Sequence, residues 1–197
     1  MAATIIFDLG GVLLHLDWHK ACTPLAELSN QSYEAVSTEV RNGPIVQSSM
    51  LGQLTPQEFH RSICAKIQAD VAFDQFIDIW NRILREDEDM AALVKELGRC
   101  HRLILASNTD GIHIAHSMEN FEFLGAFDRY FLSNEMGLLK PDPTYFQYIL
   151  DELQTPPSDC IFIDDRSENV LSARNLGING LVFESIDKLK SDLFEII

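Results

Sequence analysis

Four short runs of consecutive apolar residues, rich in β-branched side chains, constrain the fold of this chain more than any other feature. Runs of this length suit strands that are buried on both faces of a parallel sheet. They cover residues 4–7, 102–106, 160–163 and 180–183, with a weaker fifth run at 130–132. Helical apolar spacing lies between them, at residues 90–97 and 145–153 and at Val170, Leu171, Ala173 and Leu176. The alternation predicts an α/β fold, a central parallel sheet flanked by helices.

One long stretch, from Asp17 to Glu88, breaks this alternation. Its apolar residues follow a helical period and no clear strand, as in Phe73, Phe76, Ile77, Trp80, Ile83 and Leu84. Thr55, followed by Pro56 and by Glu58, predicts a helix start with a capping box. We therefore expect an all-helical insert at residues 17–87 and an α/β core built from residues 1–16 and 88–197. The acidic residues 86–89 predict the return to the core through a helix N-terminal turn.

Polar residues follow the predicted strands at the points where the strands end. Asp8 follows the first strand and precedes two glycines, and Ser107 and Asn108 follow the second. Asp164 and Asp165 follow the strand at residues 160–163. Because the carboxyl ends of parallel strands meet in one crevice, we expect these side chains to lie close together.

The residue types at this edge indicate phosphate and metal chemistry. Two adjacent carboxylates, Asp164 and Asp165, repel each other unless a cation offsets them, and with Asp8 they form a donor set that Mg²⁺ prefers. Lys140 lies in a loop stiffened by Pro141 and Pro143, which suits a phosphate clamp. Each signal alone is weak. An Asp-x-Gly turn is common, and the residues after Ser107 could equally cap a helix.

Taken together, these segments resemble the four-motif signature of the haloacid dehalogenase (HAD) superfamily. They are residues 7–13, Phe-Asp-Leu-Gly-Gly-Val-Leu; residues 107–109, Ser-Asn-Thr; residues 139–143, Leu-Lys-Pro-Asp-Pro; and residues 162–165, Phe-Ile-Asp-Asp. The long interval between the first two matches the position of the insert in the helical-cap subfamily. Within the superfamily the chain is similar to bacterial α-glucose-1-phosphate phosphatase-type members and to the N-terminal phosphatase domain of soluble epoxide hydrolase.

The resemblance implies a Rossmann-like HAD core and a Mg²⁺-dependent phosphatase that forms an aspartyl-phosphate at Asp8. It places the metal at the Asp8 carboxylate, the Gly10 backbone carbonyl and Asp165, with Asp164 supporting them. The phosphate oxygens would be bound by Ser107, by the Asn108 backbone and by Lys140, which also counts as catalytic. The expected substrate is a small phosphorylated metabolite, with a sugar phosphate favoured.

One position departs from the usual phosphatase pattern. Typical members carry a second aspartate two residues after the nucleophile, as general acid and base, and this chain has Gly10 there. General acid–base catalysis contributes roughly 10²–10⁴-fold to a rate. The substrate could have a good leaving group, such as an anomeric oxygen, which we favour. Alternatively, His15 or Asp17 could carry the proton, or the protein could be a slow relative.

Two other functions remain open on the sequence alone. Haloacid dehalogenases use the same first-motif aspartate without a metal, but their fourth motif lacks the paired carboxylates, so Asp164 and Asp165 favour the phosphatase. The second alternative is a phospho-ligand-binding relative with little turnover, for which the glycine at position 10 is the one argument. Substrate choice would lie in the insert, where several polar or aromatic residues could face the cleft: Trp18, His19, Gln47, Gln53 and His60.

The net charge of −15 disfavours nucleic acid and anionic membranes as partners, because a strongly acidic surface repels both. The chain has no apolar run near the ~20 residues of a membrane-spanning helix, and its first residues lack a basic leader. We therefore expect a cytoplasmic protein; its oligomeric state is not predicted. His113 and His116 share a predicted helix face without a third ligand, which indicates structural or surface residues.

Overall fold

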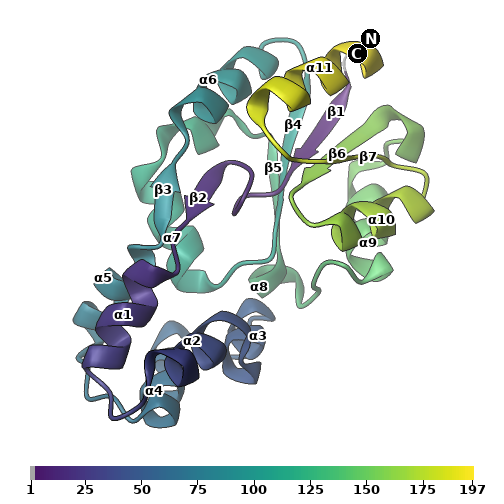
Figure 1. The fold of residues 1–197 in the computed structure, drawn as a ribbon. Coiled ribbons are helices and arrows are strands. Elements are labelled where there is room, and N and C mark those ends of the chain that lie inside the picture. Colours follow the sequence, from purple (N-terminus) through teal and green to yellow (C-terminus); the bar gives the residue numbers. More distant parts are fainter. Residues whose placement is uncertain (1–2) are drawn as a thin grey trace.

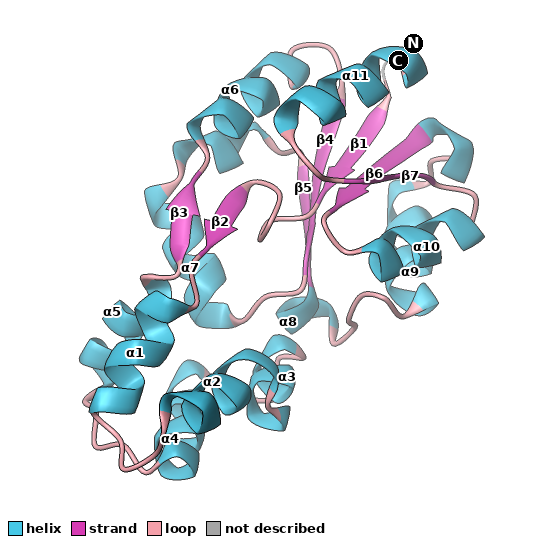
Figure 2. Cartoon of the chain, in the orientation of Figure 1, coloured by secondary structure: helices cyan, strands magenta, loops and turns pink. Residues whose placement is uncertain are grey.

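The central element of the computed structural model, which describes residues 3–197, is a five-stranded parallel sheet (Figures 1 and 2). The strands are β1 (Thr4–Phe7), β4 (Arg102–Ser107), β5 (Arg129–Leu132), β6 (Cys160–Asp164) and β7 (Asn179–Val182), in the order β5-β4-β1-β6-β7. β1 lies at the centre and pairs with β4 and β6. The predicted fold class is confirmed, and all five apolar runs lie on these strands or extend one residue beyond them.

Helices cover both faces of the sheet because successive strand residues point to opposite sides. Phe7 packs on the face covered by α6 (Glu88–Leu97), α7 (Gly111–Asn120) and α11 (Ile186–Ile196). Ile6 packs on the other face, against α9 (Pro143–Leu153) and α10 (Ser167–Asn175). The shorter helices are α8 (Ser133–Met136), η1 (Glu122–Ala126) and η2 (Pro157–Asp159). Leu171 does not belong to the predicted buried face: it is 58% exposed, because α10 turns Val170 and Ala173 toward the sheet instead.

Five helices form a second lobe, seen below the sheet in Figure 1. They are α1 (His19–Glu27), α2 (Tyr33–Asn42), α3 (Pro44–Met50), α4 (Pro56–Ile67) and α5 (Phe73–Asn81). Their apolar faces meet in a hydrophobic cluster that also takes in Ile112 of α7 and is centred on the buried rings of Phe59, Phe76 and Trp80. The predicted start of α4 is confirmed: Thr55 and Glu58 exchange both hydrogen bonds of a capping box.

A two-stranded antiparallel ribbon joins the lobes and corrects one prediction. β2 (Leu14–Leu16) pairs with β3 (Leu84–Glu86), so the stretch from Asp17 to Glu88 does contain a strand. The helical pattern does not continue through Leu84, because α5 ends at Asn81. A three-residue strand has too little local pattern to be recognised, and β3 forms by pairing with a segment about 70 positions earlier. The acidic residues after it behave as predicted, with Asp87 capping α6.

Candidate active site

Three carboxylates meet at the carboxyl ends of the two central strands. Asp8 follows β1, Asp164 ends β6, and Asp165 comes next, and because β1 pairs with β6 their side chains emerge side by side. One oxygen atom of each lies within 4.8 Å of the corresponding atoms of the other two. The structure thus brings together the three acids that the sequence places in a metal site.

Lys140 completes this cluster from the loop before α9. Its Nζ atom lies 2.9 Å from an oxygen of Asp8 and 2.7 Å from an oxygen of Asp164, and it donates a 2.9 Å hydrogen bond to the Ala106 carbonyl. The side chain is only 4% exposed. The ammonium group is therefore held in one place, with its charge between two carboxylates.

The electrostatics of the cluster favour a further cation. Burial raises the pKa of Asp8 to about 7; Lys140 acts in the opposite direction, while the negative charge of Asp164 raises this pKa again. Burial, followed by the charge of Asp164, also raises the pKa of Asp165. One ammonium group faces three carboxylates, so a divalent cation would offset the remaining charge. The donor set, carboxylate oxygens at close range, fits Mg²⁺.

Asp164 is oriented by α10, the helix that follows it. The Asn169 amide donates to both Asp164 oxygens, at 2.9 and 3.0 Å, and the Arg166 backbone N–H donates to one of them at 2.9 Å. Asn169 is 2% exposed and was not predicted. Its position five residues after Asp164, in the first turns of a helix, was the available signal.

The glycines after Asp8 make room for different neighbours. Gly11 has φ of +84°, and a Cβ atom there would lie 2.4 Å from a carboxylate oxygen of Asp165. At Gly10 a Cβ atom would lie 2.9 Å from a methyl group of Leu16. The space beside Gly10, where a second aspartate would project, is therefore taken up by the Leu16 side chain.

The residues after β4 serve partly as structural links. The Asn108 amide donates to the Lys140 carbonyl at 2.8 Å and accepts from the Lys140 backbone N–H at 2.9 Å. Asp110 caps α7 by accepting from the backbone N–H groups of Ile112 and His113. Ser107, at the end of β4, is buried at 2% exposure and does not line the cleft described below. Its role and that of Asn108 in phosphate binding stay predictions.

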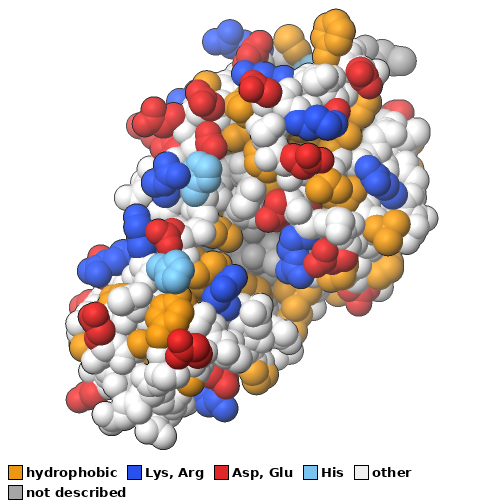
Figure 3. All heavy atoms as spheres, in the orientation of Figure 1, with side chains coloured by type: hydrophobic (Ala, Val, Ile, Leu, Met, Phe, Trp, Pro, Cys, Tyr) orange, Lys and Arg blue, Asp and Glu red, His pale blue; other side chains and the backbone are white. Residues whose placement is uncertain are grey.

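A cleft of about 730 Å³ opens between the two lobes directly over this cluster. Its lining from the α/β lobe and the ribbon is Asp8, Gly10, Leu16, Asn108, Leu139, Lys140, Pro141, Asp142, Asp165, Arg166 and Asn169. Its lining from the helical lobe is Trp18, Arg41, Asn42, Val46, Gln47 and Met50. Figure 3 shows the hollow between the lobes, with Lys or Arg side chains on both of its sides. The size is ordinary for a small-molecule site.

A family model described as haloacid dehalogenase-like hydrolase matches residues 2–177. The chain belongs to this family. The HAD superfamily membership predicted from the four motifs is therefore confirmed, and the cluster of Asp8, Asp164, Asp165 and Lys140 lies where the motifs of this HAD-like hydrolase converge.

Several relatives act on phosphate esters. The D-ribitol-5-phosphate phosphatase of Bacteroides thetaiotaomicron is 25% identical over 90% of this chain and 89% of its own length. The sesquiterpene phosphatase of Aspergillus oryzae is 26% identical over 89% of this chain and 87% of its own. A drimenol cyclase of Aspergillus calidoustus is 27% identical over the whole chain, which spans only 37% of that protein.

Solved structures share the fold closely. A HAD family enzyme of Bacteroides thetaiotaomicron, in complex with magnesium and inorganic phosphate, superposes with a TM-score of 0.86 at 27% identity, covering 96% of this chain and 99% of that one. L-2-haloacid dehalogenase of Xanthobacter autotrophicus has a TM-score of 0.67 at 16% identity, covering 100% of this chain and 85% of that one. The second likeness concerns the fold alone.

Neither proposed substitute for the missing proton carrier lines the cleft of this HAD-like hydrolase. The His15 ring lies 3.0 Å from Asp87, and Asp17 accepts from the His19 backbone N–H at 3.2 Å. Leu16 and Trp18, which alternate with His15 and Asp17 along the chain, line the cleft instead.

Two of the residues named as possible cleft residues, Trp18 and Gln47, line it. The other candidates do not. The His19 ring is hydrogen-bonded to the Tyr33 hydroxyl at 2.7 Å, and the His60 ring to the Val71 carbonyl at 2.7 Å.

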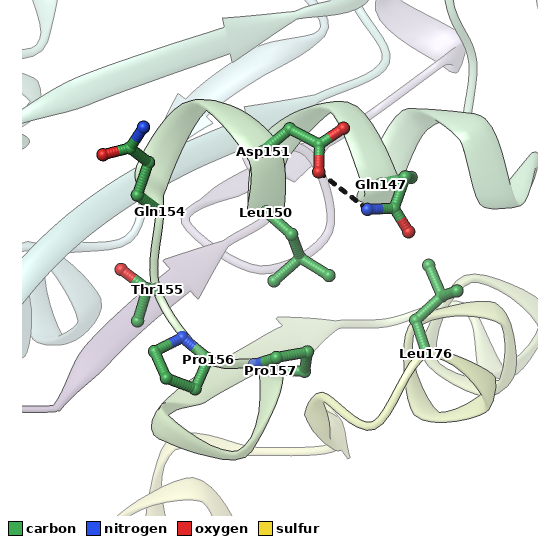
Figure 4. Close-up of a pocket in the computed structure, with 8 residues that line it drawn as sticks. All are labelled: Gln147, Leu150, Asp151, Gln154, Thr155, Pro156, Pro157 and Leu176. Carbon is green, nitrogen blue, oxygen red and sulfur yellow. Dashed lines mark hydrogen bonds between the residues drawn. The ribbon is translucent and has the colours of Figure 1, made fainter.

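A second hollow, of about 460 Å³, lies at the opposite edge of the sheet. Figure 4 shows it between the C-terminal half of α9 and the Pro156–Pro157 segment that leads into β6, with the Gln147 amide donating to Asp151. This edge holds the amino end of β6, whereas the carboxylates lie at its carboxyl end.

No helix in residues 3–197 has the length and apolar content needed to cross a membrane.

Proposed function

We propose that this HAD-like hydrolase is a Mg²⁺-dependent phosphatase that hydrolyses a small phosphate monoester, with a sugar phosphate favoured. The observation that carries the proposal is the cluster of Asp8, Asp164 and Asp165 around Lys140 at the floor of the cleft. The phosphatase relatives and the magnesium–phosphate complex of the Bacteroides thetaiotaomicron enzyme support it.

In the proposed reaction an Asp8 oxygen attacks phosphorus, the bond to the ester oxygen breaks, and an aspartyl-phosphate forms. Water then attacks the phosphorus of this intermediate, the bond between the Asp8 oxygen and phosphorus breaks, and the free Asp8 carboxylate and inorganic phosphate are released. Lys140 holds Asp8 in position and balances charge on the transferring group, together with donors at Ser107 and the Asn108 backbone. Mg²⁺, bound by Asp8, the Gly10 carbonyl and Asp165, would offset the negative charges that otherwise keep nucleophile and phosphate apart.

The leaving oxygen receives no proton from position 10, because Gly10 has no side chain that could donate one. A leaving group of low pKa needs less protonation, and an anomeric sugar oxygen is of this kind. This supports the expectation of a sugar 1-phosphate over an ester of a simple alcohol.

We also propose that residues 17–87 act as a cap over residues 1–16 and 88–197. Helices α1 to α5 share a hydrophobic cluster, and both chain crossings to them run through the β2–β3 ribbon. The helical wall of the cleft comes from this segment, so it would select the organic part of the substrate.

The direct test is phosphate release from a panel of sugar phosphates with Mg²⁺, using the wild-type chain and Asp8→Asn. We expect release by the wild type, its loss in EDTA, and at least 10³-fold less release by Asp8→Asn, because an amide oxygen is a poor nucleophile. Asp151→Asn is the matched control, since Asp151 is exposed on α9 and does not line the cleft, and it should keep wild-type turnover.

Other results would point elsewhere. Hydrolysis of 2-haloacids that survives EDTA would favour the dehalogenase alternative. Binding of sugar phosphates by the wild type without release on any ester would favour a binding protein with little turnover.

A further inference from the structure

The helical wall of the cleft carries one arginine, Arg41, in the last turn of α2. Within residues 3–197 its side chain makes no hydrogen bond or ion pair with another residue of the chain. Its position matters because the chain has twice as many acidic as basic residues, 30 against 15. Arg41 is exposed and lines the cleft, so its guanidinium group is accessible to an anionic ligand there.

Three acids on the same helix or in the same cleft already have partners, whereas Asp165, which also lines the cleft, is one of the expected metal ligands. Glu39, on the same helix, pairs with Lys66 at 3.3 Å. Asp142, across the cleft, caps α9 and accepts from the Thr144 backbone and hydroxyl at 2.9 and 2.7 Å. Asp8, the nucleophile, is paired with Lys140.

The second arginine that lines the cleft, Arg166, already has an acidic partner. Arg166, on the α/β side, donates to Glu168 through its Nε atom at 2.8 Å. The surroundings of Arg41 include the apolar side chains of Val46 and Met50, next to the amides of Asn42 and Gln47. A guanidinium group presents a planar pair of donors that matches the geometry of a carboxylate.

We propose that Arg41 is a specificity-determining residue that binds a second anionic group, a carboxylate, on the organic part of the substrate. The inference rests on the proposed phosphatase function, because it places the phosphoryl group at Asp8 and the organic part toward the helical wall. The substrate class is then a phosphorylated sugar acid. The phosphoryl group of such a molecule lies against Lys140 and the metal, and its carboxylate lies against Arg41.

The test compares pairs of esters that differ only in a hydroxymethyl group or a carboxylate. The pairs are glucose and glucuronate 1-phosphate, galactose and galacturonate 1-phosphate, and glycerol 3-phosphate and 3-phosphoglycerate. We expect kcat/KM to favour the acid in at least one pair by about tenfold, as one charge-assisted hydrogen-bonded pair allows. Arg41→Gln should abolish this preference through KM, and Arg41→Lys should retain part of it.

Arg61→Gln is the control, since Arg61 is exposed on α4 and does not line the cleft. It should keep the preference of the wild type. Equal kcat/KM within every pair, or a preference that survives Arg41→Gln, overturns the role of Arg41 while phosphate release still supports the phosphatase. No release from any of these esters or from 4-nitrophenyl phosphate with Mg²⁺ counts against the phosphatase itself.

Discussion

At the scale of single residues, the short segment after Asp8 has the strictest steric demands of the site. Gly11 adopts a left-handed conformation that non-glycine residues occupy at a cost of about 1–2 kcal/mol. Its missing side chain is also what lets the Asp165 carboxylate approach the backbone. The glycine therefore serves both the turn and the placement of a predicted metal ligand.

We expect Gly11→Ala to displace Asp165, because the new Cβ atom would lie 2.4 Å from its Oδ2 atom. Phosphate release should fall at least tenfold, and the Mg²⁺ concentration for half-maximal activity should rise. Gly125→Ala is the control, since no atom lies within 4 Å of a Cβ atom there. A Gly11→Ala protein with wild-type Mg²⁺ dependence would show that Asp165 does not hold the metal.

At the scale of elements, the site depends on how the end of β4 is joined to the loop before α9. Asn108 makes two hydrogen bonds to the backbone of Lys140, and these fix the position of that loop relative to the end of β4. The Lys140 side chain then reaches back to the Ala106 carbonyl on the same strand. The loop and the strand thus form one unit that aims the ammonium group.

Asn108→Ala should remove both backbone links and let the Lys140 loop shift. We expect a stability loss of about 1–3 kcal/mol in urea unfolding, and a fall in kcat of about 10²-fold, since misplacement of a catalytic group by 1 Å has effects of this size. Asn120→Ala, at the exposed end of α7, should change neither quantity much. If kcat stays at the wild-type value despite the stability loss, the link does not position Lys140.

At the scale of the whole molecule, a buried charged group connects the lobes. Asp110 and His113 lie on α7 of the α/β lobe and form an ion pair at 3.0 Å. Trp80, on α5 of the helical lobe, donates its indole N–H to Asp110 at 3.0 Å, and the His113 ring is within 3.0 Å of its carbonyl oxygen. The Trp80 and His113 rings stack at 5.1 Å. His113 is therefore a structural residue, as predicted from its sharing a helix face with His116 without a third metal ligand.

This pair makes stability depend on pH in a defined direction. Burial acts to lower the pKa of His113, but the charge of Asp110 and the hydrogen bonds to Asp110 and to the Trp80 carbonyl together outweigh it, and the pKa is raised above 6.5. Burial acts to raise the pKa of Asp110, but the charge of His113 and the hydrogen bonds from His113 and Trp80 together outweigh it, and the pKa is lowered from 3.8. The histidine contribution is complete below pH 6.5 and is lost as pH rises through its folded pKa. The aspartate contribution is complete above 3.8 and is lost on acidification.

We expect His113→Asn to lower the free energy of unfolding by about 3 kcal/mol at pH 6, because it leaves the Asp110 carboxylate buried without its partner. The loss should shrink at alkaline pH, where the wild type has also lost the histidine charge. Urea unfolding between pH 5.5 and 9 measures this, with His19→Asn, exposed on α1, as a control that keeps the wild-type profile. A constant difference between His113→Asn and the wild type across this range would contradict the charged pair.

Much of the fold could be predicted from local pattern, because a strand buried on both faces must be apolar along its whole length. The runs at β1, β4 and β6 carry that signal, and parallel strands bring their carboxyl ends to one edge whatever the rest of the chain does. The sequence alone therefore predicts that Asp8 lies beside the Asp164–Asp165 pair. Their roles as nucleophile and metal ligands stay predictions for the kinetic tests above.

What the tertiary structure decided are the features that depend on residues far apart in the chain. β3 is a strand because it pairs with β2, and Lys140 is buried because β4 and β6 close around its loop. Leu16 lies beside Gly10 on β2, which is held by its pairing with β3, and Arg41 faces the cleft through the way the helical lobe meets the sheet. The composition of a segment determines what it can form alone, whereas the partners of a side chain are determined by which distant segments fold against it.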